Sequence, residues 1–193
     1  MLTPQLYAIF KQHPVVTTDS RVCPDGAIFF ALKGPNFNGN NFAELAIEKG
    51  CSYAVVDEWD ENKSRPKHII LVDDVLATLQ KLANYHRKTF KTPVVAITGT
   101  NGKTTTKELA AAVLSKEFKV LYTQGNYNNH IGVPLTLLSM TNEHEIAVIE
   151  MGASHPGDIK ELCEIAEPNY GLITNVGVAH IEGFKSVENV IKT

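Results

Sequence analysis

The residues best suited to carry chemistry lie between Pro93 and Lys107, in the run PVVAITGTNGKTTTK. The short apolar run 94–97 predicts a strand that is buried on both faces. Residues 98–102 predict a turn whose glycines let a ligand approach the backbone. A helix is expected from Lys103 onwards, and its regular apolar face consists of Leu109, Ala110, Val113 and Leu114. A strand, a glycine turn, a Lys-Thr pair and a helix in this order are the layout of a phosphate-binding loop.

Each part of that layout has a chemical use. Backbone N–H groups and the N-terminus of the predicted helix offer partial positive charge to an anion. The ammonium of Lys103 can reach the terminal phosphates of a nucleotide, and the hydroxyl of Thr104 can hold Mg²⁺. The match is to the short pattern G-x-x-G-K-T-T, because Ile97 stands where the general pattern has its first glycine. A plain glycine turn is the alternative, but the loop and both flanking elements together favour binding of a nucleoside triphosphate with magnesium.

Segments after the loop offer further candidates. Glu150 ends the apolar run 145–151, where burial of a carboxylate is costly without a cation such as Mg²⁺. An exposed carboxylate at a strand end is the alternative. His180 lies in a glycine-flanked loop and suits either a metal or phosphate contact or simple exposure. Three amides in one loop suit substrate binding or turn stabilisation equally: Asn126, Asn128 and Asn129.

Nearer the N-terminus, Ser20 and Arg21 end a predicted strand. Arginine suits a phosphate or a carboxylate, and a surface ion pair is the alternative. Residues 33–41, KGPNFNGNN, predict a polar loop that is long enough to bind a ligand. The sequence contains no Ser-His-Asp order at a recognisable spacing and no H-E-x-x-H, which argues against a serine hydrolase and a zinc protease.

Composition narrows the class of protein. The 193 residues carry a formal net charge of -3, which argues against general attraction to nucleic acids or membranes. No apolar run approaches the ~18 residues of a membrane span, and the N-terminus lacks the basic start and apolar core of a secretory signal. Because Cys23, Cys51 and Cys163 are far apart and odd in number, we expect reduced structural thiols in the cytoplasm.

Strands alternating with helices predict an α/β fold in two parts. Residues 1–91 are expected to form a small mixed α/β domain, followed by a hinge at Lys91-Thr92-Pro93. Residues 92–193 are expected to form part of a P-loop ATPase domain with a parallel sheet. Ligands of such sheets bind at the carboxyl ends of the strands. Four candidate residues fall at or just past such ends: Gly99, Glu150, Asn175 and His180.

The run T-G-T-N-G-K-T-T-T at 98–106 resembles the ATP loop of the Mur ligases, the ATP-dependent amide-forming enzymes of peptidoglycan synthesis. Four further blocks are similar to this family and occur in the family's order. They are TDSR at 18–21 with FFALKG at 29–34, GNYNNHIGVPLTLL at 125–138, IEMGASHPGDI at 149–159, and ITNVGVAHIEGF at 173–184. The resemblance covers nearly the whole chain, and the blocks together are far more specific than the loop alone.

The resemblance implies an ADP-forming ligase that joins D-Ala-D-Ala to UDP-MurNAc-tripeptide through an acyl phosphate, using ATP and Mg²⁺. Its biological role would be cell wall biogenesis, and hence cell shape and division. The family has three domains, and the chain resembles the N-terminal domain and the first part of the central one. We therefore expect an incomplete fragment that is inactive alone, monomeric and cytoplasmic, with neither a nucleic-acid partner nor a membrane span.

The resemblance also implies residue roles. Seven residues would bind ATP: Gly99, Thr100, Asn101, Gly102, Lys103, Thr104 and Thr105. Thr104 and Glu150 would hold one Mg²⁺ and His180 would serve a second, so that Lys103, Glu150 and His180 form the catalytic set. The UDP-linked substrate would contact Ser20, Arg21 and the loop that begins at Lys33, and Asn129 would lie near the phosphates or the substrate carboxylate.

Two other functions stay open at this stage. One is a related ATP-dependent amide ligase, either the enzyme that adds the third peptide residue or a folylpolyglutamate synthase, although the asparagine-rich block 125–134 argues against both. The other is a non-catalytic module that binds a nucleotide or a UDP-sugar peptide weakly.

Overall fold

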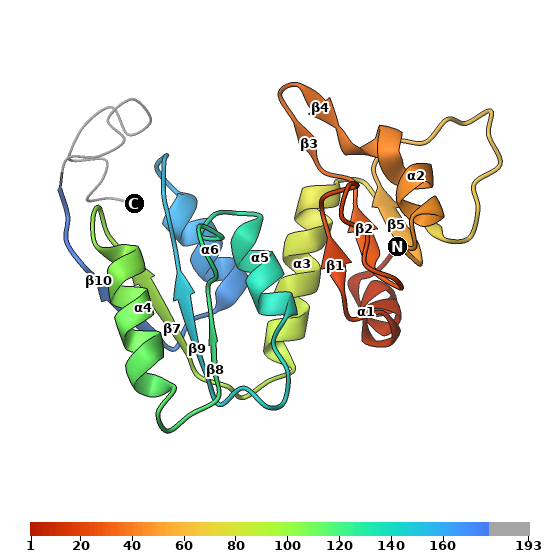
Figure 1. Ribbon diagram of the computed structural model, residues 1–193. Coiled ribbons are helices and arrows are strands. Elements are labelled where there is room, and N and C mark those ends of the chain that lie inside the picture. Colours follow the sequence, from red (N-terminus) through yellow and green to blue (C-terminus); the bar gives the residue numbers. More distant parts are fainter. Residues whose placement is uncertain (178–193) are drawn as a thin grey trace. The chain divides into compact units, whose positions relative to one another are not determined.

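The computed structural model describes residues 1–177, which fold into two compact units (Figure 1). The first unit is Met1–Tyr85, and the second begins at His86. The division falls within helix α3 (Val75–Lys88), ahead of the hinge expected at 91–93. Each unit has a four-stranded parallel sheet of its own, which confirms the α/β class predicted from the alternation of strands and helices.

The first unit places its sheet strands in the order β1-β2-β5-β6. Its elements before α3 are α1 (Thr3–Gln12), β1 (Val16–Thr17), β2 (Ile28–Phe30), β3 (Lys33–Gly34), β4 (Phe37–Asn38), the 3₁₀ helix η1 (Gly39–Phe42), α2 (Ala43–Glu48), β5 (Tyr53–Val56) and β6 (Ile69–Leu71). All three residues of β2 are fully buried, as expected of an inner strand of a parallel sheet. Small residues of α2, Ala43 and Ala46, pack against the same core as Phe29 and let the helix lie close to the sheet.

The segment expected to be a loop, residues 33–41, is ordered by polar contacts. β3 and β4 pair as an antiparallel hairpin, with Lys33 opposite Asn38. The side chain of Asn38 accepts from the backbone N–H of Asn40 at 3.0 Å and so caps η1. Strands of two residues carry no alternating pattern, which is why the sequence predicted only a loop here.

The second unit has the strand order β10-β7-β9-β8. Its elements after α3 are β7 (Val94–Thr98), α4 (Lys103–Leu114), β8 (Val120–Tyr122), α5 (Gly132–Leu138), β9 (Ile146–Glu150), α6 (Asp158–Ala166) and β10 (Tyr170–Ile173). Right-handed crossovers place α4 on one face of this sheet and α5 and α6 on the other. The observed packing agrees, since α5 contacts α6 and α4 contacts β7, β8 and β9 (Figure 1).

This topology has a switch point between β7 and β9. The chain leaves β7 through α4 towards β8, whereas it leaves β9 through α6 in the opposite direction towards β10. The register pairs Ile97 with Glu150, so both strands end at the same edge of the sheet. A crevice at such a point is where open α/β sheets bind ligands.

The apolar face predicted for α4 is wrong at Leu109 and Val113, whereas Ala110 and Leu114 are partly buried. Leu109 is 63% exposed and Val113 is 70% exposed, whereas Lys107 and Ala111 are buried. Positions 107 and 111 lie one helical turn apart and face the sheet, so a lysine occupies a core position of this helix. Apolar periodicity cannot find such a face, because one of its members is charged.

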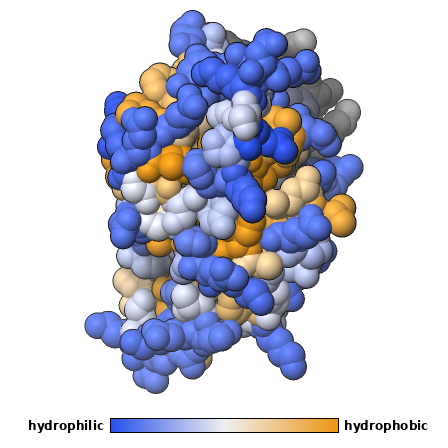
Figure 2. Space-filling view, turned by 90° about the vertical axis from the view of Figure 1, so that its right-hand side faces the viewer, coloured by the Kyte–Doolittle hydropathy of each residue, from blue (hydrophilic) through white to orange (hydrophobic). Residues whose placement is uncertain are grey.

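The view in Figure 2 shows a mostly hydrophilic face on which apolar residues form separate patches. Within residues 1–177, no helix combines the length and the apolar character needed to cross a membrane.

The last residues of α3 belong to the second unit, where a buried arginine fixes them. Arg87 is 7% exposed, and its Nε donates to the carbonyl of Ala166 at 3.1 Å. That carbonyl ends α6, where helix carbonyls have no partner in the helix itself. Nη2 of Arg87 donates to Oδ1 of Asn169 at 3.1 Å, and the same oxygen accepts from the N–H of Val94, the first residue of β7. Burial lowers the pKa of Arg87 from its usual value.

We therefore expect Arg87→Met to lower the free energy of unfolding by about 2–3 kcal/mol, because buried carbonyls lose a charged donor. The matched control is Lys88→Met, which removes only an exposed ion pair with Glu167 and should cost less than about 1 kcal/mol. Urea unfolding of this chain measures both values, and equal effects of the two substitutions would contradict the assignment.

Candidate functional site

The turn between β7 and α4 requires glycine at two positions. Gly102 has a φ of +79° and occupies the N-cap of α4, and Gly99 has a φ of +132°. A Cβ at Gly99 would also clash with the hydroxyl of Thr174. Only glycine adopts these conformations at low cost, so the two glycines fix the path of the loop before the helix.

The loop is held from the side by the segment that follows β10. The backbone N–H groups of Thr100 and Asn101 donate to the carbonyl and the side-chain oxygen of Asn175, each at 3.0 Å. Thr174 Oγ1 in turn donates to the carbonyl of Asn101 at 2.6 Å. Two of the N–H groups expected to face phosphates are thus engaged within the protein. The donors left for an anion are those of the first turn of α4, which have no acceptor inside the helix.

Lys103 begins α4 and extends back over the loop. Its Nζ donates to the carbonyls of Gly99 at 2.7 Å and Thr100 at 3.2 Å. The ammonium is therefore satisfied by the loop itself, at the side where an anion on the helix N-terminus would lie.

Glu150 ends β9 and is 1% exposed. Its Oε1 accepts from Thr104 Oγ1 at 3.1 Å and from Asn128 Nδ2 at 2.8 Å. Its Oε2 is buried and has no hydrogen-bond partner among the described residues. Burial of an ionised carboxylate is costly without a cation, so the open oxygen beside a threonine hydroxyl suits a hard divalent ion such as Mg²⁺.

Within residues 1–177 no group of three or more His, Cys, Asp and Glu side chains could hold a metal by itself. Mg²⁺ usually takes one or two protein oxygens as ligands and completes its coordination shell with water and phosphate. Thr104 and Glu150 would supply that number of protein oxygens. His180 lies outside the described residues.

Two asparagines of the asparagine-rich loop have different partners. Asn128 donates to Glu150, and its carbonyl accepts from the N–H of Gly152 at 2.7 Å, which ties the loop to the end of β9. Asn129 Oδ1 accepts from the N–H groups of Ile131 and Gly132 at 3.0 and 2.9 Å, as a turn-stabilising amide does. The sequence raised both roles without separating them, and Asn128 was not among the residues assigned to the site.

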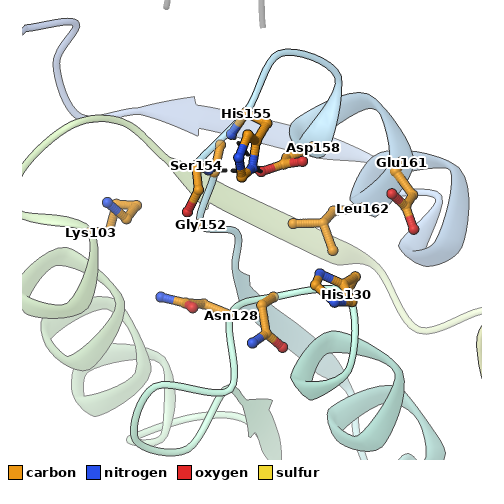
Figure 3. A pocket seen from close by; sticks show the side chains of 11 residues that line it. Lys103, Asn128, His130, Gly152, Ser154, His155, Asp158, Glu161 and Leu162 are labelled. Carbon is orange, nitrogen blue, oxygen red and sulfur yellow. Dashed lines mark hydrogen bonds and ion pairs between the residues drawn. The ribbon is translucent and has the colours of Figure 1, made fainter. Parts of the chain in front are cut away.

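A pocket of about 410 Å³ lies beside these groups (Figure 3). Lys103 lies on one side of it, Asn128 and His130 on another, and the turn from Gly152 into α6 on a third. Asp158 Oδ2 accepts from the N–H groups of Ser154 at 2.7 Å and His155 at 2.9 Å, which orders that turn. The pocket thus lies at the switch point between β7 and β9, next to the predicted phosphate-binding loop.

The candidate residues of the first unit have partners of their own. Arg21 forms a bidentate contact with Asp19, with distances of 2.9 and 2.7 Å, and this bond holds the pKa of Asp19 down at about 2. Lys33 Nζ contacts Asp57 at 2.8 Å and Glu58 at 2.7 Å, and these bonds raise the pKa of Lys33. Ser20 is buried, and its carbonyl accepts from Lys49 Nζ at 3.0 Å. A substrate phosphate would have to compete with carboxylates for both cations.

Comparison with known proteins gives a consistent result. Residues 97–193 match the Mur ligase middle domain, and residues 14–87 match the Mur ligase family, catalytic domain. The UDP-N-acetylmuramoyl-tripeptide–D-alanyl-D-alanine ligase of Bacillus subtilis is 43% identical over 175 residues, covering 91% of this chain and 38% of the relative. That of Escherichia coli is 42% identical over 181 residues, covering 92% and 38%.

Solved structures agree with these sequence matches. MurF from Acinetobacter baumannii superposes with a TM-score of 0.85 at 37% identity, covering 91% of this chain and 38% of that one. MurF ligase from Thermotoga maritima, in complex with ADP, gives 0.84 at 37% identity, covering 93% and 41%. The chain therefore spans about 38% of the length of the curated relatives named here.

The open oxygen of Glu150 has a consequence for stability. In the absence of divalent metal, Glu150→Gln should raise the free energy of unfolding by about 1–3 kcal/mol, because a buried charge is replaced by a neutral amide that can still accept from Thr104. Glu145→Gln, at the exposed residue just before the same strand, is the matched control and should change little, because a glutamine oxygen can still accept from the N–H of Lys119. Thermal melting with a chelator present tests this prediction. A destabilised Glu150→Gln would show that hydrogen bonds within the fold already stabilise the charged carboxylate.

Proposed function

The chain belongs to the Mur ligase family, and from this we propose that it forms part of an ATP-dependent ligase that joins D-Ala-D-Ala to UDP-MurNAc-tripeptide. The relatives near 40% identity that carry this name support the choice among Mur ligases. The observation that carries the proposal is the contact between Thr104 and Glu150, which brings the phosphate-binding loop and a buried carboxylate together at the switch point of the sheet.

ATP is the proposed phosphate donor. Its phosphates would lie on the first turn of α4, within the segment Gly99–Thr105, and Lys103 would exchange its loop carbonyls for the terminal phosphates. The ADP bound to the related Thermotoga maritima ligase supports a nucleotide in this family. Gly102 supports the proposal further, because its left-handed conformation directs the chain into the N-terminus of α4.

Mg²⁺ would be held by the hydroxyl of Thr104 and the open Oε2 of Glu150, and His180 is the proposed ligand of a second ion. Bound there, Mg²⁺ would supply positive charge that offsets the negative charge of the phosphates during transfer. Asn128 would keep the carboxylate oriented through its bond to Oε1.

The reaction has two steps. An oxygen of the terminal carboxylate of the tripeptide attacks the γ-phosphorus, and the bond from that phosphorus to the bridging oxygen breaks to release ADP. The amine of D-Ala-D-Ala then attacks the acyl carbon, phosphate leaves, and the amine loses a proton. Lys103 would stabilise the charge on the transferred group, and most of the remaining catalysis is positioning.

The UDP-linked substrate is proposed to contact Ser20, Arg21 and Lys33 in the first unit, with Asn129 near its carboxylate. Arg21 and Lys33 would then trade carboxylate partners for phosphates, and both are bound to acids at present. The proposed reaction uses ATP and a UDP-linked precursor. We therefore propose that the protein acts in the cytoplasm, where such nucleotides are found.

Lys103→Ala tests the nucleotide site. In a protein that carries this chain at the length of its relatives, the substitution should reduce ADP release by about 100-fold or more, because it removes a charge that acts on the transferred phosphoryl group. Lys116→Ala, an exposed lysine after α4, is the control. Activity of Lys103→Ala within a factor of about 3 of the parent, which is under 1 kcal/mol of barrier, rejects the site.

A second experiment separates a ligase from a binding module. We expect the 193-residue chain to show no ligation and weaker ATP binding than the version at its relatives' length, because positioning of acyl phosphate and amine can account for roughly 7–11 kcal/mol of barrier. Coupled ADP release with UDP-MurNAc-tripeptide and D-Ala-D-Ala measures both proteins. Equal substrate-dependent turnover would overturn this expectation, and none in either protein would favour the module.

A further inference from the structure

Three side chains stand out among the buried polar residues of the described chain. Lys107 and Thr123 are 0% exposed and Glu150 is 1% exposed, less than any of the other buried polar residues there. They come from three different elements: the middle of α4, the residue after β8, and the end of β9. Lysine is almost never fully buried without a reason, since its ammonium must be desolvated.

The three residues form one connected chain of hydrogen bonds. Lys107 Nζ donates to the carbonyl of Thr123 at 2.8 Å. Thr123 Oγ1 accepts from the backbone N–H of Glu150 at 2.9 Å, and Thr123 N–H donates to the carbonyl of Val148 at 3.1 Å. Residue 123 therefore joins the ammonium in α4 to the backbone of the strand that carries the candidate metal ligand.

The ammonium of Lys107 is engaged by groups within the protein. It also contacts Glu108 Oε1 at 2.6 Å and lies 5.7 Å from the centre of the Tyr122 ring. It donates neither to the carbonyls bound by Lys103 nor to the Glu150 carboxylate. Lys107 is thus placed to act through Thr123 rather than on a ligand.

We propose that Lys107 is a positioning residue for the proposed reaction, which holds Glu150 in the orientation needed to bind Mg²⁺ with ATP. This inference rests on the proposed function. Residues behind a ligand commonly change metal affinity by about 10–100-fold when they are replaced, although they never touch the metal. Lys107 acts, through Thr123, on the backbone N–H of Glu150. The carboxylate of Glu150 is held separately by Thr104 and Asn128.

The main test is the Mg²⁺ dependence of ATP binding by this chain, measured by calorimetry. Lys107→Met keeps the side-chain length but removes the charge and the donors, and it should raise the Mg²⁺ concentration for half-maximal ATP binding about tenfold. ATP binding with a chelator present should not change. Lys116→Met is the matched control and should leave both values at those of the parent.

A second pair of variants keeps the test valid if Lys107→Met does not fold. Thr123→Val removes the oxygen that accepts from Glu150 and should shift the Mg²⁺ dependence in the same direction, whereas Thr123→Ser keeps that oxygen and should not. In a Glu150→Gln background, Lys107→Met should add no further shift, because its effect passes through Glu150. Additive shifts would overturn the proposal.

Hydrogen exchange of the Glu150 amide gives a measurement that needs no nucleotide. Lys107→Met should speed its exchange relative to the parent and to Lys116→Met, because Thr123 would lose its anchor. Unchanged exchange and unchanged Mg²⁺ dependence would together reject the role. If the 193-residue chain binds no ATP, exchange of the Glu150 amide alone decides whether Lys107 positions Glu150, and the Lys103→Ala experiment at the relatives' length decides the proposed function separately.

Discussion

A carboxylate with one oxygen that lacks a donor within the described residues lies buried at the end of β9. The cost of that arrangement explains much of the surrounding structure, because a buried charge must be held by hydrogen bonds until a cation arrives. Glu150 receives bonds from α4, from the asparagine-rich loop and, through its backbone, from Thr123. Three connections of the second unit thus converge on one residue, and they do so at the point where the sheet's topology opens a crevice.

Around Glu150, the loop backbone is held rigidly, whereas the side chain of Lys103 can change its partners. The loop backbone is fixed by glycine conformations and by Asn175, so it needs little reorganisation to present the first turn of α4 to an anion. Within the part of the chain that the structure describes, Lys103 is bound only to loop carbonyls, which a phosphate can replace. The site therefore combines a preformed cradle with one cation that can change partners, which is a suitable arrangement for phosphoryl transfer.

The sequence predicted the strand, glycine turn and helix of 94–114 because each element has a strong local signal. It also predicted that Glu150 ends an apolar strand, since a carboxylate at the end of an apolar run is conspicuous. It could not predict that Asn128 rather than Asn129 binds Glu150, because adjacent amides differ only in where the turn points them. The apolar face expected for α4 was wrong at Leu109 and Val113, because the buried face includes a lysine, which an apolar pattern does not contain. The short hairpin within 33–41 had no periodic signal at all.

Lys103 and Lys107 show why this limit is physical. They are one helical turn apart on the same side of α4, and local sequence gives them the same charge, length and helix propensity. The two lysines differ in how deeply their ammonium groups are buried. Lys103 donates to loop carbonyls at the helix end, and Lys107 donates to the carbonyl of Thr123 inside the fold. An ammonium at the helix end can exchange partners with a ligand, whereas one with no exposed surface exchanges only if the fold opens. Two identical side chains thus supply different charges: that of Lys103 can change partners and that of Lys107 is fixed. The position of each lysine relative to the sheet behind the helix causes this difference.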